Sequence, residues 1–163
     1  MALFPTPQRL ARFVLISGVV LAADILTKQL ALSALFAPPR IIEVTSFFNL
    51  VPVWNSGVSF GLFRDYPSVV SWAIPLLACA VILWLISELS RLSTSQQIGA
   101  GFIAGGALGN VIDRLRFGRV VDFLDVHLAG YHWPAFNLAD AAIFIGVMLW
   151  LYGMIQGERT QDR

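Results

Sequence analysis

Residues 105–140 read GGALGNVIDRLRFGRVVDFLDVHLAGYHWPAFNLAD, and the rest of the chain is organised around this segment. The segment contains four of the ten acidic residues, and they stand between two uncharged apolar runs at residues 92–112 and 141–157. The four are Asp113, Asp122, Asp125 and Asp140. A carboxylate held against an apolar medium costs free energy, and such a residue is therefore a candidate functional group. The segment predicts polar chemistry at the ends of two apolar helices.

The composition of the chain is typical of a membrane protein. Of its 163 residues, 57% are hydrophobic and 13% are charged, against about 25% charged in a soluble domain; the mean hydropathy is +0.73. A helix needs about 20 mostly apolar residues to cross the hydrocarbon core. The uncharged runs at 66–87 and 92–112 meet that length alone, whereas those at 13–23 and 141–157 need Asp24 and residues 137–140 to lie at the membrane boundary. We predict an all-α membrane protein, one domain over residues 1–163, with four transmembrane helices at about 10–31, 67–88, 95–114 and 138–157.

The first apolar run has a second interpretation. Arg9 and Arg12 precede an 11-residue apolar core, and Ala22 with Ala23 resembles a signal-peptide cleavage site. We favour an uncleaved helix because the apolar pattern continues and further spans follow. Lys and Arg are divided five against six between the two sides that four spans define, and the first helix slightly favours a cytoplasmic N-terminus. The net charge of +1 indicates neither a nucleic-acid partner nor a polybasic lipid patch.

The long loop after the first helix predicts a small extracytoplasmic β-rich segment at about residues 40–63. The stretch IIEVTSFFNLVPVWN at 41–55 is rich in β-branched and aromatic residues, which favour strands. We expect it on the membrane surface with Phe47, Phe48 and Trp54 at headgroup depth, followed by tight turns at Gly57 and Gly61. A further candidate strand, VVDFLDVHL, occupies residues 120–128.

The third predicted helix carries a doubled G-x-x-x-G pattern at Gly101, Gly105 and Gly109. Such small residues let neighbouring backbones approach closely, either within one chain or between copies. No strand precedes these glycines, which excludes a nucleotide-binding loop.

Asp122 and Asp140 are the candidate catalytic pair. They are 18 residues apart, one after the third predicted helix and one at the start of the fourth. If those helices are antiparallel neighbours, both carboxylates emerge at the same membrane face. Two carboxylates close together share one proton near neutral pH, so that one accepts a proton from water while the other polarises a scissile carbonyl. This is the chemistry of an aspartic peptidase.

Structural roles also explain why acids stand at these two positions. Asp140 falls three residues after Asn137, where an acid suits the first turn of a helix and the helix dipole. Asp122 has Arg119 as a potential ion-pair partner. From spacing alone, the structural and catalytic interpretations stand level.

Two further charged pairs have the same ambiguity. Asp113 and Arg114 either cap the third helix with a local ion pair, or orient the acid pair or bind a lipid phosphate. Asp24 and Lys28 are four residues apart and share a helix face. They form either an ion pair at the membrane boundary or a support for the site.

Residues 57–61, GVSFG, match the G-x-S-x-G motif. The nucleophile elbow needs the sheet of an α/β-hydrolase, for which four spans leave no room. A serine hydrolase using Ser59 with His127 or His132 remains a minor alternative. The two histidines lack H-E-x-x-H spacing and Cys79 is the single cysteine, so neither a metal nor an organic cofactor is predicted.

Five short motifs resemble those of the lipoprotein signal peptidase family (signal peptidase II), which are bacterial membrane aspartic peptidases. The motifs are D-x-x-x-K at 24–28, NSGVSF at 55–60, GALGN at 106–110 followed by Asp113 and Arg114, VDF at 121–123, and FNLAD at 136–140. They cover most of the chain in the family's order and at comparable spacing. Ser59 stands where many relatives have alanine, which explains the accidental elbow motif.

The resemblance implies four helices, both termini in the cytoplasm and a periplasm-facing active site in the bacterial inner membrane. It implies catalysis by Asp122 and Asp140. The supporting and substrate-binding positions that it implies are Asn55, Gly57, Asn110, Asp113, Arg114, Asn137, Asp24 and Lys28. The implied substrate is a prolipoprotein whose lipobox cysteine already carries diacylglycerol, cut just before that cysteine. Membrane lipid and globomycin-type inhibitors are further implied partners.

A small proton-coupled transporter is the competing class, with Asp24, Asp113, Asp122 and Asp140 as a relay. Transporters usually place such acids near the bilayer midplane and contain internal repeats. In this sequence the acids cluster at predicted helix ends and no repeat is found.

Overall fold

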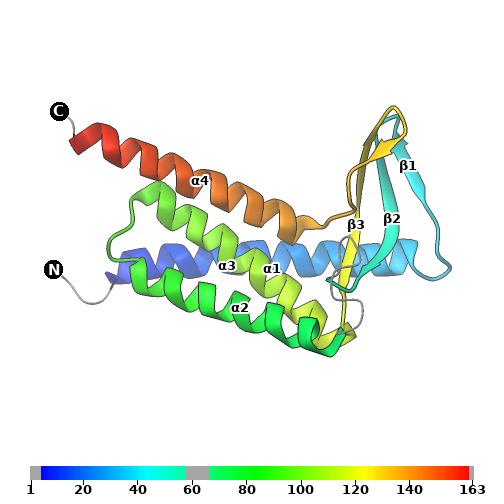
Figure 1. Cartoon of the computed structure of the whole chain (residues 1–163), viewed down its shortest axis with the longest axis horizontal. Helices are drawn as coiled ribbons and strands as arrows, with labels where there is room; N and C mark the ends of the chain where they lie inside the picture. The colour runs from blue at the N-terminus through cyan, green and yellow to red at the C-terminus, as the bar shows by residue number, and fades with distance from the viewer. Residues whose placement is uncertain (1–4, 58–66, 162–163) are drawn as a thin grey trace.

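The described residues fold into four long helices with a small antiparallel sheet across one end of them (Figure 1). The computed structural model describes residues 5–57 and 67–161. The helices are α1 (Pro7–Leu35), α2 (Pro67–Glu88), α3 (Thr94–Phe117) and α4 (Leu138–Gln161). The strands are β1 (Ile42–Thr45), β2 (Phe48–Asn55), β3 (Val120–Leu128) and β4 (Tyr131–His132). The described chain ends both lie at the end of the helices away from the sheet (Figure 1).

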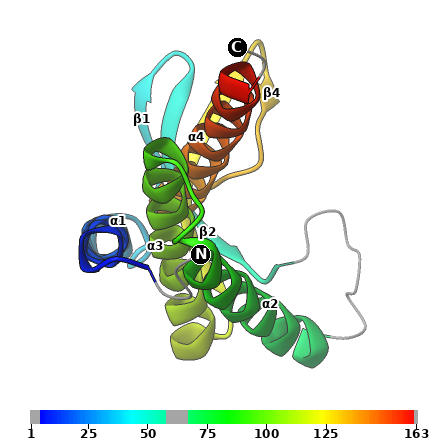
Figure 2. The ribbon, with the colours of Figure 1, turned by 90° about the vertical axis from the view of Figure 1, so that its left-hand side faces the viewer.

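Helix α3 is the centre of the bundle. It packs against α1, α2 and α4, which surround it in Figure 2. Local sequence fixes both of its ends. Ser93 caps the N-terminus, because its Oγ accepts the N–H of Gln96 while the Gln96 side chain accepts the N–H of Ser93. Gly118 ends the helix at φ 69°, a left-handed conformation that glycine adopts without strain.

Adjacent glycines let α3 contact two neighbouring helices at once. A Cβ atom on Gly105 would lie 2.7 Å from the backbone oxygen of Ser17 in α1, and one on Gly106 would overlap the backbone oxygen of Ala139 in α4. Only a residue without a side chain permits these approaches. The close packing that the G-x-x-x-G pattern predicts therefore occurs between helices of the same chain.

Two helices in the described parts of the chain are long and apolar enough to cross a membrane on their own. They are α1 over Pro7–Leu35 and α4 over Leu138–Gln156, and the part of α2 whose side chains are described, Trp72–Glu88, is also apolar. The sequence predicts that the run in α3 suffices alone and that those in α1 and α4 are marginal, but among the described residues α1 and α4 qualify and α3 does not. Helices α1 and α4 qualify because they continue well beyond their uncharged runs, and the charged Asp24 within α1 is buried inside the bundle.

The sheet has the strand order β1-β2-β3-β4, with every neighbouring pair antiparallel. The β-rich segment expected after the first helix supplies β1 and β2, and the candidate strand at 120–128 is β3. In the pairing of β2 with β3, Val53 faces Asp122 and Asn55 faces Val120. Val121 and Phe123 of β3 pack with Ala31 and Leu35 of α1 in a buried cluster. This cluster fixes the sheet against the bundle and thereby fixes Asp122.

The aromatic residues expected at headgroup depth differ in their surroundings. Phe47 is 54% exposed, as that expectation requires. Trp54 instead packs against the rings of Phe36 and Phe117, at centroid distances of 5.0 and 5.5 Å, and Arg119 covers it. Trp54 therefore joins the sheet to the end of α1 and to α3, and its depth in the membrane stays a prediction.

Candidate functional site

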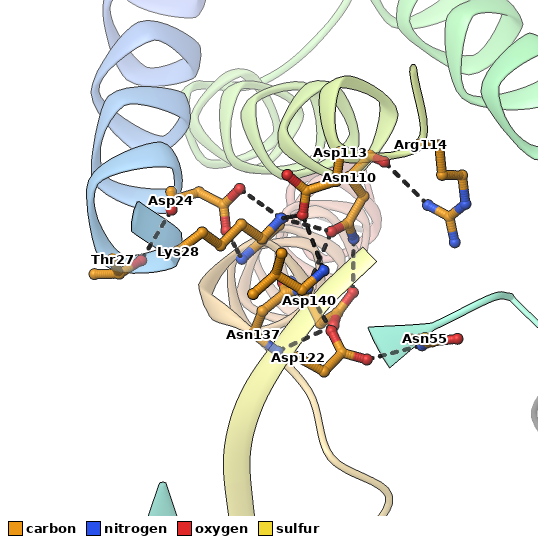
Figure 3. Close-up of polar contacts among 12 residues, drawn as sticks. Asp24, Thr27, Lys28, Asn55, Asn110, Asp113, Arg114, Asp122, Asn137 and Asp140 are labelled. Atoms are coloured by element: carbon orange, nitrogen blue, oxygen red, sulfur yellow. Dashed lines mark hydrogen bonds and ion pairs between the residues drawn. The ribbon is translucent and has the colours of Figure 1, made fainter. Parts of the chain in front are cut away.

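The polar residues that the sequence motifs contain meet where the sheet joins the bundle (Figure 3). They come from α1, the end of β2, the second half of α3, β3 and the start of α4. They are Asp24, Lys28, Asn55, Asn110, Asp113, Arg114, Asp122, Asn137 and Asp140. Most of them are buried, and a buried polar group is stable only when it is hydrogen-bonded or paired.

Asp122 lies on β3 with only 1% of its surface exposed. Asn137 Nδ2 donates to its Oδ1 at 2.7 Å, and Asn55 Nδ2 donates to its Oδ2 at 2.8 Å. Burial raises the pKa of Asp122 to about 6; the hydrogen bond from Asn55 opposes this rise, and the negative charge of Asp140 adds to it. The suggested ion pair with Arg119 is wrong, because that guanidinium lies over the ring of Trp54, 4.4 Å from its centroid.

Asp140 lies in the first turn of α4 and forms a reciprocal cap with Asn137. The Asp140 N–H donates to Asn137 Oδ1 at 3.0 Å, and the Asn137 N–H donates to Asp140 Oδ2 at 3.2 Å. The helix-start role expected for Asp140 is confirmed. It leaves Oδ1 to accept a hydrogen bond from Asn110 Nδ2 at 2.8 Å. The cap therefore holds Asp140 beside the network that contains Asp122.

Two asparagines connect the two carboxylates. Asn137 Nδ2 donates both to Asp122 and to Asn110 Oδ1, the latter at 3.1 Å. Asn110 Nδ2 in turn donates to Asp140. Asp122 and Asp140 are thus joined by an unbroken chain of hydrogen bonds through two side-chain amides (Figure 3). The antiparallel arrangement of α3 and α4 places both acids at one site, as the sequence argument required.

Lys28 lies beneath this network with 2% of its surface exposed. Its Nζ is 2.8 Å from Asp24 Oδ2, 3.0 Å from Asp113 Oδ2 and 3.0 Å from Asn110 Oδ1. Asp24 and Lys28 form the ion pair that their spacing predicts, and Lys28 also contacts Asn110 of the site. The local ion pair expected between Asp113 and Arg114 is wrong, because Asp113 pairs with Lys28 and accepts the N–H of Val121.

Arg114, Asn55 and Gly57 lie at the edge of the same site. Arg114 Nη1 donates to the backbone oxygen of Asn110 at 3.2 Å. Asn55 Oδ1 accepts the N–H of Gly57 at 2.7 Å, and Gly57 has φ 83°, which completes the tight turn expected there. This turn fixes the oxygen of Asn55 and leaves its amide N–H groups directed at Asp122.

A cavity of about 420 Å³ opens beside Asp140. Its other lining residues are Trp133, Phe136, Ala141, Phe144 and Ile145, all apolar or aromatic. The sequence shows Trp133 and Phe136 as part of an aromatic cluster, but nothing in the sequence assigns them to a cavity. An apolar pocket with a single carboxylate suits an apolar ligand that presents one polar group.

The serine alternative finds no support in the described residues. Ser59 lies in the segment 58–66, outside the described residues, as does Gly61. His127 stacks on His132 at 4.7 Å between centroids, and His132 Nδ1 lies 2.9 Å from the Asp125 carboxylate. These histidines therefore belong to a separate cluster on β3 and β4.

The described parts of the chain also contain no group of three His, Cys, Asp or Glu side chains arranged to hold a metal ion.

Comparison with known proteins identifies the family. The sequence model described as "Signal peptidase (SPase) II" matches residues 16–156. The chain belongs to the signal peptidase II family. Family membership makes it a membrane protein and a peptidase that acts in lipoprotein processing.

Curated relatives and solved structures agree with this assignment. A lipoprotein signal peptidase of Desulforapulum autotrophicum is 41% identical over 152 residues, covering 91% of this chain and 94% of its own length. One of Burkholderia multivorans is 42% identical over 157 residues, covering 95% and 94%. A bacterial membrane enzyme solved by the in meso method at 1.9 Å is 26% identical, with a TM-score of 0.77 over 94% of this chain and 97% of its own. A second such structure, at 2.3 Å, has a TM-score of 0.75 and 25% identity over 96% and 93%.

Proposed function

We propose that this signal peptidase is an aspartic endopeptidase whose catalytic dyad is Asp122 and Asp140. One observation carries the proposal: two carboxylates from different elements are joined by one buried amide network at the edge of an apolar bundle. A carboxyl group that titrates near neutral pH is suited to proton transfer. The raised pKa of Asp122, about 6, supports this role.

The reaction needs one proton shared by the dyad. The ionised carboxylate accepts a proton from water as the water oxygen attacks the scissile carbonyl carbon, while the protonated carboxyl donates its proton to the carbonyl oxygen. When the carbon–nitrogen bond breaks, the leaving amine takes a proton from the dyad and the diol oxygen returns one. The dyad ends with the single proton with which it began.

We infer that the substrate is a lipoprotein precursor cut just before its diacylglyceryl-modified cysteine. The curated relatives are named lipoprotein signal peptidases, and the five sequence motifs resemble that family. The apolar cavity beside Asp140 supports this choice, since Phe144 and Ile145 on α4 offer an apolar chain a path to the carboxylate. A globomycin-type inhibitor would compete for the same space.

We further propose four membrane passes with the active site facing the periplasm of a bacterial inner membrane. The sheet and the dyad share one end of the bundle, and both described chain ends lie at the other (Figure 1). Arg9 and Arg12 near the N-terminus favour the cytoplasm for that end. Helix α3, flanked by three helices, needs less apolar surface than a helix exposed to lipid.

The test is cleavage of a diacylglyceryl-modified prolipoprotein by purified wild type, Asp122→Asn and Asp140→Asn in detergent or liposomes. We expect both variants to lose activity while they remain folded and bind substrate. The matched control is Asp125→Asn, which changes a carboxylate on the same strand whose partners are His132 and Asn49. Activity retained by either dyad variant would move catalysis elsewhere.

The transporter interpretation has less support. Its four acids lie close together in one cluster (Figure 3), and two of them are paired with Lys28. A proton relay needs acids distributed along a path. Proton flux into liposomes by wild type, without cleavage of prolipoprotein, would favour the transporter.

A further inference from the structure

We infer that Lys28 is a positioning residue for the dyad: its ammonium group fixes the oxygen of Asn110 and thereby directs the amide N–H groups of Asn110 and Asn137 at Asp140 and Asp122. The inference rests on the proposed function of the dyad but concerns a residue that contacts neither catalytic carboxylate in the described contacts. The arrangement of donors and acceptors carries it.

An ammonium group can only donate hydrogen bonds. The Asn110 atom that lies 3.0 Å from Lys28 Nζ must therefore be the amide oxygen. The NH₂ group of Asn110 then faces Asp140 Oδ1 at 2.8 Å, where a carboxylate needs a donor. The reversed amide would direct nitrogen at the ammonium group and oxygen at the carboxylate, and both contacts would be repulsive.

The orientation of the Asn137 amide group is fixed in the same way. Its Nδ2 lies 3.1 Å from Asn110 Oδ1 and 2.7 Å from Asp122 Oδ1. Its oxygen is already held by the N–H of Asp140. With the Asn110 oxygen fixed by Lys28, the NH₂ group of Asn137 has two acceptors and a single orientation.

Lys28 is itself held by the two acids that anchor the backbone beside the dyad. Asp24 Oδ1 accepts the N–H of Ala139, the residue before Asp140, at 2.9 Å. Asp113 Oδ2 accepts the N–H of Val121, the residue before Asp122, at 3.1 Å. Three oxygens lie within 3.0 Å of the ammonium nitrogen: Asp24 Oδ2 and Asp113 Oδ2, with which it forms ion pairs, and Asn110 Oδ1, to which it donates a hydrogen bond. One buried cation thus connects the backbone and the side-chain supports of both catalytic acids.

The test distinguishes the loss of the orienting contact of Lys28 from a change in the net charge of the site. The variant Lys28→Met with Asp24→Asn removes one cation and one anion, so the site keeps its net charge, and the asparagine oxygen still accepts the N–H of Ala139. We expect kcat to fall about ten- to one-hundredfold, where each tenfold loss corresponds to about 1.36 kcal/mol, and KM to change by less than about threefold. The structural control is Ser17→Ala, which removes a hydrogen bond to the Gly101 oxygen in the same α1–α3 interface and should lower Tm without changing kcat.

A double-mutant cycle with Asn110→Ala shows whether Lys28 acts through Asn110. We expect the charge-balanced pair to cause no further loss of kcat in the Asn110→Ala background. The inference would be overturned if the losses of kcat multiply when the pair is combined with Asn110→Ala, or if the pair alone retains wild-type kcat. If the charge-balanced pair does not fold, the variant Asn110→Asp is used instead. This variant keeps an oxygen for Lys28 but removes the donor that faces Asp140. Wild-type kcat in Asn110→Asp would also overturn the inference. Failure of the dyad itself is recognised separately, as cleavage that persists in Asp122→Asn or Asp140→Asn.

Discussion

Replacing Lys28 by methionine should destabilise the folded protein far more than removing an ion pair at the surface. The side chains of Lys28 and Asp24 are 3% and 0% exposed, and that of Asp113 is 7% exposed. Removal of one partner from a buried ion pair costs about 3–5 kcal/mol, because an uncompensated charge remains in a medium of low dielectric constant. In this variant two such carboxylates remain.

The assay is thermal unfolding in detergent micelles, followed by circular dichroism. For a chain of this size, a loss of 1 kcal/mol lowers Tm by about 2–4 °C, so we expect a decrease of roughly 6–20 °C. The control is Arg91→Met, which removes the 3.4 Å contact between Arg91 and Glu88. The side chain of Arg91 is 60% exposed and that of Glu88 is 29% exposed. Exposed pairs contribute about 0–1 kcal/mol. A Tm for Lys28→Met no lower than that of the control would refute the buried ion network.

Three further predictions concern the dyad, the helix contact and the cavity. Because the pKa of Asp122 is raised from 3.8 to about 6, the contribution of its proton to the free energy of unfolding is complete below pH 3.8 and is lost as pH rises through 6. The dyad loses its shared proton over the same range, so kcat/KM should decline on the basic side of pH 6. A pH–rate profile that stays flat to about pH 8 would contradict this. Gly106→Leu should separate α4 from α3 at the Ala139 oxygen, lowering Tm and abolishing cleavage, whereas Gly18→Ala, with nothing within 4 Å, should leave both unchanged or slightly raise Tm. Phe144→Asp at the cavity should raise KM about tenfold, equivalent to about 1.4 kcal/mol, with kcat little changed, and an unchanged KM would remove this cavity from the substrate path.

The sequence determines those features that depend on a few neighbouring residues. The uncharged runs predict four transmembrane helices; the described residues form four long helices, of which α1 and α4 are long and apolar enough to cross a membrane on their own. The cap at Ser93 and the stop at Gly118 follow from local hydrogen bonding and from the conformational freedom of glycine. The pairing of Asn137 with Asp140 is equally local, since three residues separate them. The five motifs also contain the polar residues that meet at the site.

Tertiary structure alone decides how those residues are connected. Lys28 and Asn110 are 82 residues apart, and Asp24 and Ala139 are 115 apart. In the sequence, Asp113 has Arg114 as its neighbour and Asp122 has Arg119 nearby, but in the fold their partners are Lys28 and two asparagines. The reason is physical: when α3 packs closely on α1 and α4, water is excluded from these groups, and each buried charge must find its partner across helices rather than along one.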